Sequence, residues 1–244
     1  MSAGQLKDLE LQFIQDSPAA HFVSDTLTSI GNAAWAAQLP WRTAQEIDRV
    51  YPPDSYHTKP SLHDTIDDIN YANRLGWRMR QFGRGVIVVA VAPELKDLPI
   101  DQQVVGYAVL RNDVSGSPLK RFLKTYPRRQ PPYAWLQSIN VRPEFQGQGI
   151  GAALLRTAAE AFPSDQPSTA YVFDENPEAL GYFARLGYAK TTEKPDPKTD
   201  YFGPDNEPVQ QWRLLAPNIG DVALLAKQVI ERNGLSVIDV SLSH

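Results

Sequence analysis

The chain has 244 residues, of which 42% are hydrophobic, and a formal net charge of −4 at pH 7. This length and composition allow a full hydrophobic core in one or two domains. The lack of cysteine excludes disulfides, zinc–thiolate sites and thiol catalysis, and it fits a cytoplasmic protein. The negative charge argues against nucleic acid as a partner. No apolar run approaches the roughly 20 residues that a membrane-spanning helix needs, and residues 1–8 lack a signal-peptide pattern.

The first third of the chain predicts one strand followed by helices. Residues 9–14 alternate weakly between apolar and polar side chains and predict the strand. Ser17 and Pro18 favour a helix start. A clearer helix is expected from 61 to 76, where one apolar stripe accompanies several aspartates near the N-terminal end. We therefore expect an enlarged helical region over about residues 16–80.

The middle of the chain predicts strands and helices in alternation. A β-branched run over 86–91 predicts a buried strand, and 104–110 is its expected hairpin partner. The proline-rich segment 191–208 is expected to be a loop, with Tyr201 and Phe202 near its centre. The remaining elements are strands over 133–141, 169–173 and 212–215, a helix with Ile150, Leu154, Ala158 and Ala161 on one face, and a helix over 177–186.

The tail beyond residue 216 predicts one more helix and a short strand. Asn218 is the expected N-cap of this helix, which ends near Gly234, and residues 237–240 suit a strand. Its expected apolar face consists of Ile219, Val222, Leu225 and Val229. We expect residues 217–244 to pack as an appendix on the domain formed by 1–216 and not to form a second domain.

The most informative segment is a glycine-rich loop between a predicted strand and a predicted helix, Gln146-Gly147-Gln148-Gly149-Ile150-Gly151. Glycine lets the backbone approach a ligand closely. A helix N-terminus leaves N–H groups without partners and carries a partial positive charge. Together these features predict a cradle for a phosphate or pyrophosphate, whereas the glycine loop alone also suits an ordinary strand-to-helix turn.

Two common phosphate-binding motifs fit this loop poorly. A P-loop ends in Gly-Lys-Ser or Gly-Lys-Thr, and neither lysine nor a hydroxyl follows Gly149. Gly147, Gly149 and Ala152 match the dinucleotide spacing G-x-G-x-x-A. However, Pro143 lies between the strand and the loop, and the acid at the expected distance, Asp165, lies in a proline-containing loop.

Residues 141–151 resemble the acetyl-CoA motif of the GNAT superfamily of N-acetyltransferases. That motif has Arg or Gln, two residues, Gly, one residue, and Gly or Ala, which Gln146, Gly149 and Gly151 match. A second motif of the family has an Asn, an Ala, an aromatic residue and a Gly-aromatic pair. The chain supplies the matching residues in the same order, within a resemblance that covers 134–190: Asn176, Ala179, Tyr182-Phe183 and Gly187-Tyr188.

The resemblance implies an α+β (mixed α/β) fold, with a central mixed, mostly antiparallel sheet flanked by helices. Here an enlarged N-terminal helical region and a C-terminal appendix would be added to it. The resemblance also implies an N-acetyltransferase that passes an acetyl group from acetyl-CoA directly to an amine in a ternary complex. Since the chain has no cysteine, no covalent enzyme intermediate is expected. The alternative is a non-catalytic acyl-CoA-binding module with a regulatory or interaction role.

The acceptor stays open among a polyamine-like or aminoglycoside-like molecule, a free amino acid and a protein N-terminus. Aspartates within the long N-terminal region, at 48, 54, 64, 67 and 68, hint at a cationic acceptor. Helix-end charges explain several of them equally well. The oligomeric state is also open, with a homodimer among the options, and the four histidines show no metal-ligand spacing, so no metal is expected.

The resemblance assigns most cofactor contacts to the backbone. The pantetheine arm would pair with a strand edge, and an N–H near Val141 would polarise the thioester carbonyl. Because these contacts are made by the backbone, the side chains of Gln148 and Ile150 are expected to tolerate change better than the glycines. Asn176 matches the family's cofactor-contacting Asn and also suits a helix N-cap. The implied cofactor-binding set is Ile139, Asn140, Val141, Gln146, Gly147, Gln148, Gly149, Ile150, Gly151 and Asn176.

The chain departs from the family pattern at both catalytic groups. The tyrosine that protonates the leaving thiolate usually lies seven residues after the Asn, where this chain has Phe183. Tyr182, one residue earlier, is the candidate acid, while a packing role for Tyr182 or departure of a free thiolate are the alternatives. Many family members have a Glu on the central strand, and this chain has Gln137 near that position. Candidate bases acting through water are Glu144, Asp174 and Glu175.

Overall fold

The computed structural model describes residues 6–13, 30, 85–98, 100–113, 133–202 and 208–239. The strands there are β1 (Asp8–Phe13), β2 (Gly85–Val91), β3 (Val104–Asp113), β4 (Tyr133–Val141), β5 (Ser168–Phe173), β6 (Ala189–Lys190), β7 (Asp196–Phe202), β8 (Pro208–Ala216) and β9 (Ser236–Asp239). The helices there are η1 (Pro93–Leu95), α5 (Ile100–Gln103), η2 (Pro143–Phe145), α7 (Ile150–Ala159), α8 (Pro177–Arg185) and α9 (Ile219–Asn233).

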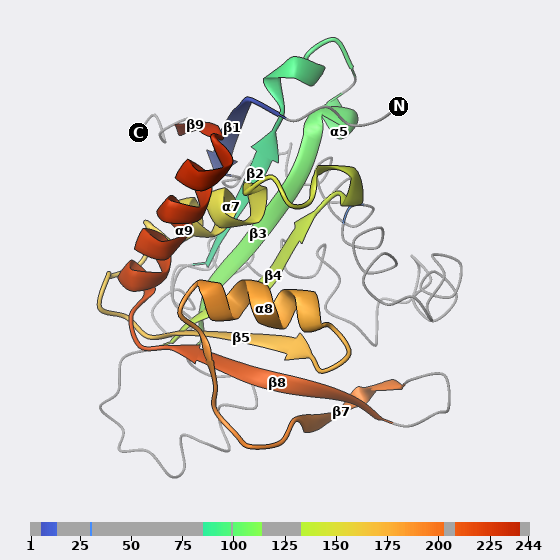
Figure 1. The fold of residues 1–244 in the computed structure, drawn as a ribbon, viewed down its shortest axis with the longest axis vertical. Coiled ribbons are helices and arrows are strands. Elements are labelled where there is room, and N and C mark those ends of the chain that lie inside the picture. The colour runs from blue at the N-terminus through green and yellow to red at the C-terminus, as the bar shows by residue number, and fades with distance from the viewer. Residues whose placement is uncertain are drawn as a thin grey trace, which may run out of the picture.

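These strands form one mixed sheet in the order β6-β8-β5-β4-β3-β2-β1-β9, and β7 pairs with β8 beside this path (Figure 1). The pairs β1–β2, β2–β3, β3–β4 and β5–β8 are antiparallel. The pairs β4–β5 and β1–β9 are parallel. The expected mixed, mostly antiparallel sheet flanked by helices is therefore confirmed. Of the helical region expected over 16–80, the structure describes only Ile30, which is helical and buried.

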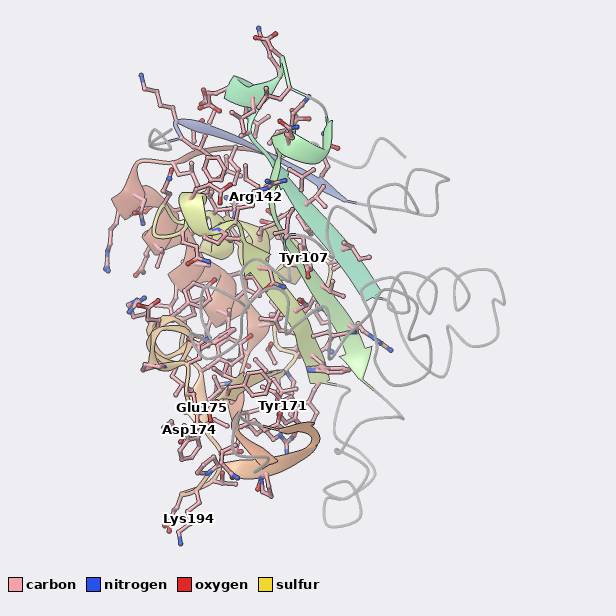
Figure 2. All side chains as sticks on the ribbon, turned by 90° about the vertical axis from the view of Figure 1, so that its right-hand side faces the viewer. Tyr107, Arg142, Tyr171, Asp174, Glu175 and Lys194 are labelled. Carbon is pink, nitrogen blue, oxygen red and sulfur yellow. The ribbon has the colours of Figure 1, made fainter. Side chains whose placement is uncertain are left out.

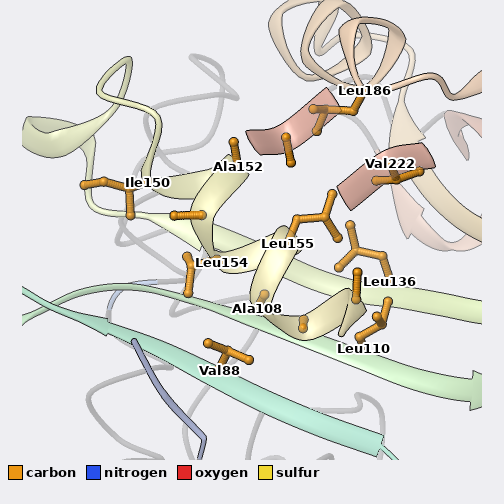
Figure 3. Packing of buried hydrophobic residues seen from close by; sticks show 14 of the residues in the cluster. Val88, Ala108, Leu110, Leu136, Ile150, Ala152, Leu154, Leu155, Leu186 and Val222 are labelled. Atoms are coloured by element: carbon orange, nitrogen blue, oxygen red, sulfur yellow. The ribbon is translucent and has the colours of Figure 1, made fainter. Parts of the chain in front are cut away.

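The core lies between the sheet and helix α7 (Figure 3). Leu154 and Leu155 of α7 are fully buried against Leu110 of β3 and Leu136 of β4. Burial of such side chains stabilises the fold by about 1.5–3 kcal/mol each. The helix is shorter than expected, because Ala161 lies beyond its end and is exposed. The apolar face that anchors α7 to the sheet also fixes the position of its N-terminus, where the glycine loop ends.

The C-terminal tail adds both a helix and a strand to this structure. Helix α9 buries Ile219, Val222, Ala226 and Ile230 in the same core as α7. Of the predicted stripe, Ile219 and Val222 are therefore confirmed as buried, whereas Leu225 and Val229 form a partly buried flank. Asn218 occupies the N-cap position, but its side chain makes no capping hydrogen bond to the backbone. Strand β9 pairs with β1 at the edge of the sheet.

One element in the expected loop 191–208 differs from the prediction. Strand β7 occupies much of this segment and pairs with β8 through Asp196–Gln211 and Phe202–Pro208. Prolines within the segment suggested a loop, but a proline is tolerated on a strand at the margin of a sheet. No helix within the described residues is both long and apolar enough to cross a membrane.

Candidate functional site

A bulge in β4 shapes the centre of the site. Val109 of β3 lies opposite Ser138, but the next residue, Leu110, lies opposite Leu136, so Gln137 is an extra residue on β4. An extra residue bends a strand and reverses which side chains face each side of the sheet. Before the bulge Leu136 faces the α7 side, and after it Ile139 packs against the same core.

Beyond this bulge β4 leaves its parallel neighbour. The pairing with β5 extends only from Ala134–Ser168 to Leu136–Ala170, and the two strands visibly diverge afterwards (Figure 1). The N–H of Arg142 points to β3, where it donates to the carbonyl of Val105. Because backbone groups alternate in direction along a strand, Val141 presents its N–H and C=O to the β5 side. Ile139 and Val141 therefore offer backbone groups that β5 leaves unpaired.

The glycine loop follows directly, and its conformation requires glycine. Gly147 has φ +78° and Gly149 has φ +89°, a left-handed region that side chains disfavour. Gly149 is the N-cap of α7, and no side chain caps this helix end. The side-chain amide of Gln146 donates to the carbonyl of Val141 at 3.0 Å. The loop thus aims the unpaired N–H groups of a helix start beside the unpaired edge of β4.

Two loop side chains are more constrained than the sequence suggested. The side-chain oxygen of Gln148 accepts a hydrogen bond from the backbone N–H of Leu6 at 2.8 Å. Ile150 is 1% exposed and belongs to the core. Whether these two side chains tolerate change better than the glycines stays a prediction, but one ties the loop to the N-terminal strand and the other anchors α7.

The two aromatic residues of α8 have different surroundings. Phe183 is buried in the core and makes an edge contact with Tyr188, with the ring centroids 5.3 Å apart. The hydroxyl of Tyr182 is buried, has no hydrogen-bond partner among the described residues and lies against Gly151 of α7. Burial raises the pKa of Tyr182 far above its ordinary value, Tyr188 raises it further and Arg185 lowers it. Tyr182 therefore keeps its proton at neutral pH and can donate it in a hydrogen bond.

Asn176 has the capping role that its position before Pro177 suggested. Its side-chain oxygen accepts a hydrogen bond from the N–H of Ala179 at 2.9 Å. The residue is 8% exposed and ends the turn between β5 and α8. The cap fixes where α8 begins, and α8 in turn carries Tyr182 to the side of α7.

A set of polar side chains, of which the sequence had singled out only Asn140 and Gln137, lies on the sheet face opposite α7. The amide of Asn140 donates to the Tyr107 hydroxyl at 2.9 Å and to the Ser138 hydroxyl at 2.7 Å. Burial raises the pKa of Tyr107, although its hydrogen bonds with Ser138 and Asn140 lower it. The side-chain amide nitrogen of Asn140 is thus engaged by Tyr107 and Ser138, and by the same alternation its backbone points to β3 and not to the β5 side.

The same face continues toward the start of β4. Arg111 of β3 donates from Nη1 to the side-chain oxygen of Gln137 at 2.9 Å, and its guanidinium lies 5.7 Å from the centre of the Trp135 ring. We call Tyr107, Arg111, Trp135, Gln137, Ser138 and Asn140 the β3–β4 polar face. A change in strand phase at the bulge produces this face, and no spacing in the sequence marks a bulge.

The candidate acids lie elsewhere. Asp174 accepts a hydrogen bond from the indole N–H of Trp212, and both Asp174 and Glu175 are exposed. Figure 2 shows these two residues beyond Tyr171 of β5 and well apart from Tyr107. Glu144 is exposed and lies 4.0 Å from Arg142. None of these three carboxylates belongs to the β3–β4 polar face.

Comparison with known proteins places these features in a family. A sequence model of the acetyltransferase (GNAT) family matches residues 44–188, and no curated protein gave a significant match. Arabidopsis thaliana NAA60 in complex with a bisubstrate analogue is 12% identical, over 84% of this chain and 96% of that chain, with TM-score 0.49. The Salmonella typhimurium yncA protein with its cofactor acetyl-CoA is 16% identical, over 86% and 93%, with TM-score 0.47. The Escherichia coli ribosomal-protein-S18-alanine N-acetyltransferase is 13% identical, over 85% and 94%, with TM-score 0.44.

Proposed function

Since the chain belongs to the acetyltransferase (GNAT) family and is an N-acetyltransferase of that type, we propose that it transfers an acetyl group from acetyl-CoA directly to an amine within a ternary complex. The observation that carries this proposal is the glycine loop, whose two left-handed glycines open helix α7 beside the unpaired edge of β4. The absence of cysteine from the chain supports direct transfer over an acyl-cysteine intermediate.

The residues present fit acetyl-CoA, which supplies the thioester carbonyl that the amine attacks. Backbone N–H groups of residues 147–151 suit the pyrophosphate, because they combine close backbone approach with a helix N-terminus, whereas the N–H of Gln146 already donates to the carbonyl of Pro143. Of the proposed edge residues Ile139, Asn140 and Val141, the first and last direct their backbone groups to the β5 side and suit the amides of the pantetheine arm, whereas the backbone of Asn140 points to β3. The N–H of Val141, directed toward the β5 side, would stabilise the negative charge that develops on the carbonyl oxygen.

Tyr182 is our proposed hydrogen-bond donor to the departing sulfur. Its support is a buried hydroxyl that has no partner among the described residues and a pKa that keeps the proton in place. A thiol has a pKa of about 8.5, so a hydroxyl less acidic than that would stabilise the thiolate by hydrogen bonding more readily than by full proton transfer. The buried Phe183 supports assigning this role to its neighbour.

The packing of α9 against α7 supports our proposal that residues 217–244 belong to the domain formed by 1–216. Helix α9 shares the core of α7, and the hypothetical Cβ of Gly149 would lie 3.4 Å from Asn233 at the end of α9. The end of α9 would then support the glycine loop, in addition to covering the core.

The proposal is tested by calorimetric titration with acetyl-CoA, coenzyme A and NAD in parallel, followed by a thiol-release screen against pooled amines. We expect micromolar binding of both coenzyme A species, no binding of NAD, and thiol release with at least one pool. Binding without thiol release from any pool would instead support a non-catalytic coenzyme-binding module. A lack of coenzyme A binding would reject the assignment of the glycine loop.

A further inference from the structure

We propose that the acceptor is an amine that also carries a carboxylate, as in an amino acid, and that Arg111 binds this carboxylate. The inference rests on the acetyl transfer proposed above and concerns its second substrate. It begins from the position of Arg111 on the β3–β4 polar face, next to the bulge at which β4 leaves β5.

The guanidinium of Arg111 is held in place by neutral groups. Gln137 accepts one of its N–H bonds at 2.9 Å, and the Trp135 ring lies beneath it at 5.7 Å. Neither contact neutralises the positive charge, and among the described residues Arg111 forms no ion pair. An arginine has five N–H donors in a planar fork, so donors remain for a planar, bidentate partner such as a carboxylate.

Among the side chains that the structure describes, the surrounding strands add no negative charge, and the side chain of Asp113 on β3 lies outside that set. The described side chains of β3, β4, β5 and β8, at 104–111, 133–141, 168–173 and 210–216, include the arginines at 111 and 213 and no carboxylate. A half-buried guanidinium interacts more strongly with an anion than one in bulk water, because the local dielectric constant is lower. This part of the sheet therefore favours an anionic group and disfavours a polyamine.

The location suits a group on the acceptor rather than on the coenzyme. Arg111 faces away from α7 and from the glycine loop, on the side that also carries Tyr107, Ser138 and Asn140. Gln137, which Arg111 contacts, is followed directly by the β4 residues that offer their backbone toward the β5 side. A carboxylate on Arg111 would thus lie toward the start of β4, opposite Trp135, and the acceptor must extend along the strand to bring its amine to the thioester near Val141.

The test compares matched amines with and without the carboxylate. Thiol release is measured for the twenty amino acids, their α-carboxamides, a side-chain acid series, spermidine and an aminoglycoside. At least one amino acid should show kcat/KM about 10- to 100-fold above that of its carboxamide, the range expected for charge-assisted hydrogen bonds. The side-chain series tells whether the α-carboxylate or a side-chain carboxylate is bound.

Two variants test whether Arg111 is responsible. Arg111→Gln should raise KM for the acid and remove most of the preference over the carboxamide, while coenzyme A binding stays unchanged. Gln137→Glu keeps Arg111 and the shape of the site but neutralises its charge, and it should produce the same loss even if Arg111→Gln folds poorly. Arg156→Gln, which removes an arginine paired with Glu160 on the surface of α7, is the control and should leave the preference intact.

The failures are distinguishable. Three results would overturn this inference and leave the proposed acetyl transfer standing. They are equal turnover of acids and carboxamides, turnover restricted to spermidine or the aminoglycoside, and, in Arg111→Gln and Gln137→Glu, an equal loss of kcat/KM for an acid and for its carboxamide. Coenzyme A binding without thiol release from any amine would overturn the proposed function, and this inference with it.

Discussion

The hydroxyl oxygen of Tyr182 lies 3.2 Å from the position that a Cβ atom would take on Gly151. The two residues belong to α8 and to the first turn of α7, so the contact joins both family motifs in space. The hydroxyl is buried and has no hydrogen-bond partner among the described residues. Such an unpaired group costs about 1–3 kcal/mol of stability. A donor retained at this cost beside a helix N-terminus is typical of a functional position.

Removal of the Tyr182 hydroxyl tests whether this residue acts in catalysis or only in packing. We expect Tyr182→Phe to lower kcat at least tenfold with little change in the Kd for acetyl-CoA, because the hydroxyl acts on the departing sulfur. The free protein should become more stable by up to about 1 kcal/mol, because an unpaired polar group is removed. Steady-state kinetics and urea denaturation measure the two effects. Wild-type turnover would reduce Tyr182 to a packing residue.

The contact with Gly151 predicts a coupling between two substitutions. Alanine stabilises a helix interior by about 1 kcal/mol relative to glycine, but in this chain the new Cβ would crowd the Tyr182 hydroxyl. Gly151→Ala should therefore give no net gain in the wild-type background and a gain in the Tyr182→Phe background. The double-mutant cycle, read by urea denaturation, should show a coupling of at least about 0.5 kcal/mol. Additive effects would mean that the two groups do not touch.

Gly149 and Gly234 form a matched pair for testing the loop. Both have a positive φ, +89° and +63°, the first at the start of α7 and the second at the C-terminal end of α9. Alanine at either position should cost about 1–3 kcal/mol through backbone strain. Only Gly149→Ala should also weaken acetyl-CoA binding, by at least tenfold in calorimetry. Equal binding by the two variants would contradict the cradle.

Local patterns in the sequence predicted the parts of the site that depend on neighbouring residues. Strand β4 has the predicted bounds, and α7 begins at Ile150 directly after the glycine loop. Asn176 caps α8 as its position before Pro177 suggested. In each case the information lies within a few residues, where glycine, proline and capping side chains restrict the backbone directly.

The remaining features depend on partners far away along the chain. The bulge at Gln137 is defined by its register against β3, and the contact between Arg111 and Gln137 spans 26 positions. Strand β7 was missed because its pairing with β8 overrides the local effect of its prolines. Tyr182 and Gly151 meet only because α7 and α8 pack on one side of the sheet. Periodicity within one segment carries no information about such pairings.

Tyr188, which ends the second motif, predicts how stability depends on alkaline pH. Its hydroxyl is 2.7 Å from that of Ser168, and burial raises its pKa to about 12, an effect that the hydrogen bond with Ser168 partly opposes. An unfolded tyrosine has a pKa of about 10. The unfolded chain therefore loses this proton first as pH rises, so stability is full below about pH 10 and falls as pH increases toward 12.

This loss should amount to about 1.4 kcal/mol per pH unit for Tyr188, in addition to contributions of the same sign from Tyr107 and Tyr182, whose pKa values are also raised. Urea denaturation of wild type and Tyr188→Phe at pH 8 and pH 11 measures it. The variant should be less stable at pH 8, where it lacks the hydrogen bond to Ser168, but should lose less stability than wild type between the two pH values. Equal losses in both proteins would mean that the Tyr188 hydroxyl ionises as readily in the folded protein as in the unfolded chain.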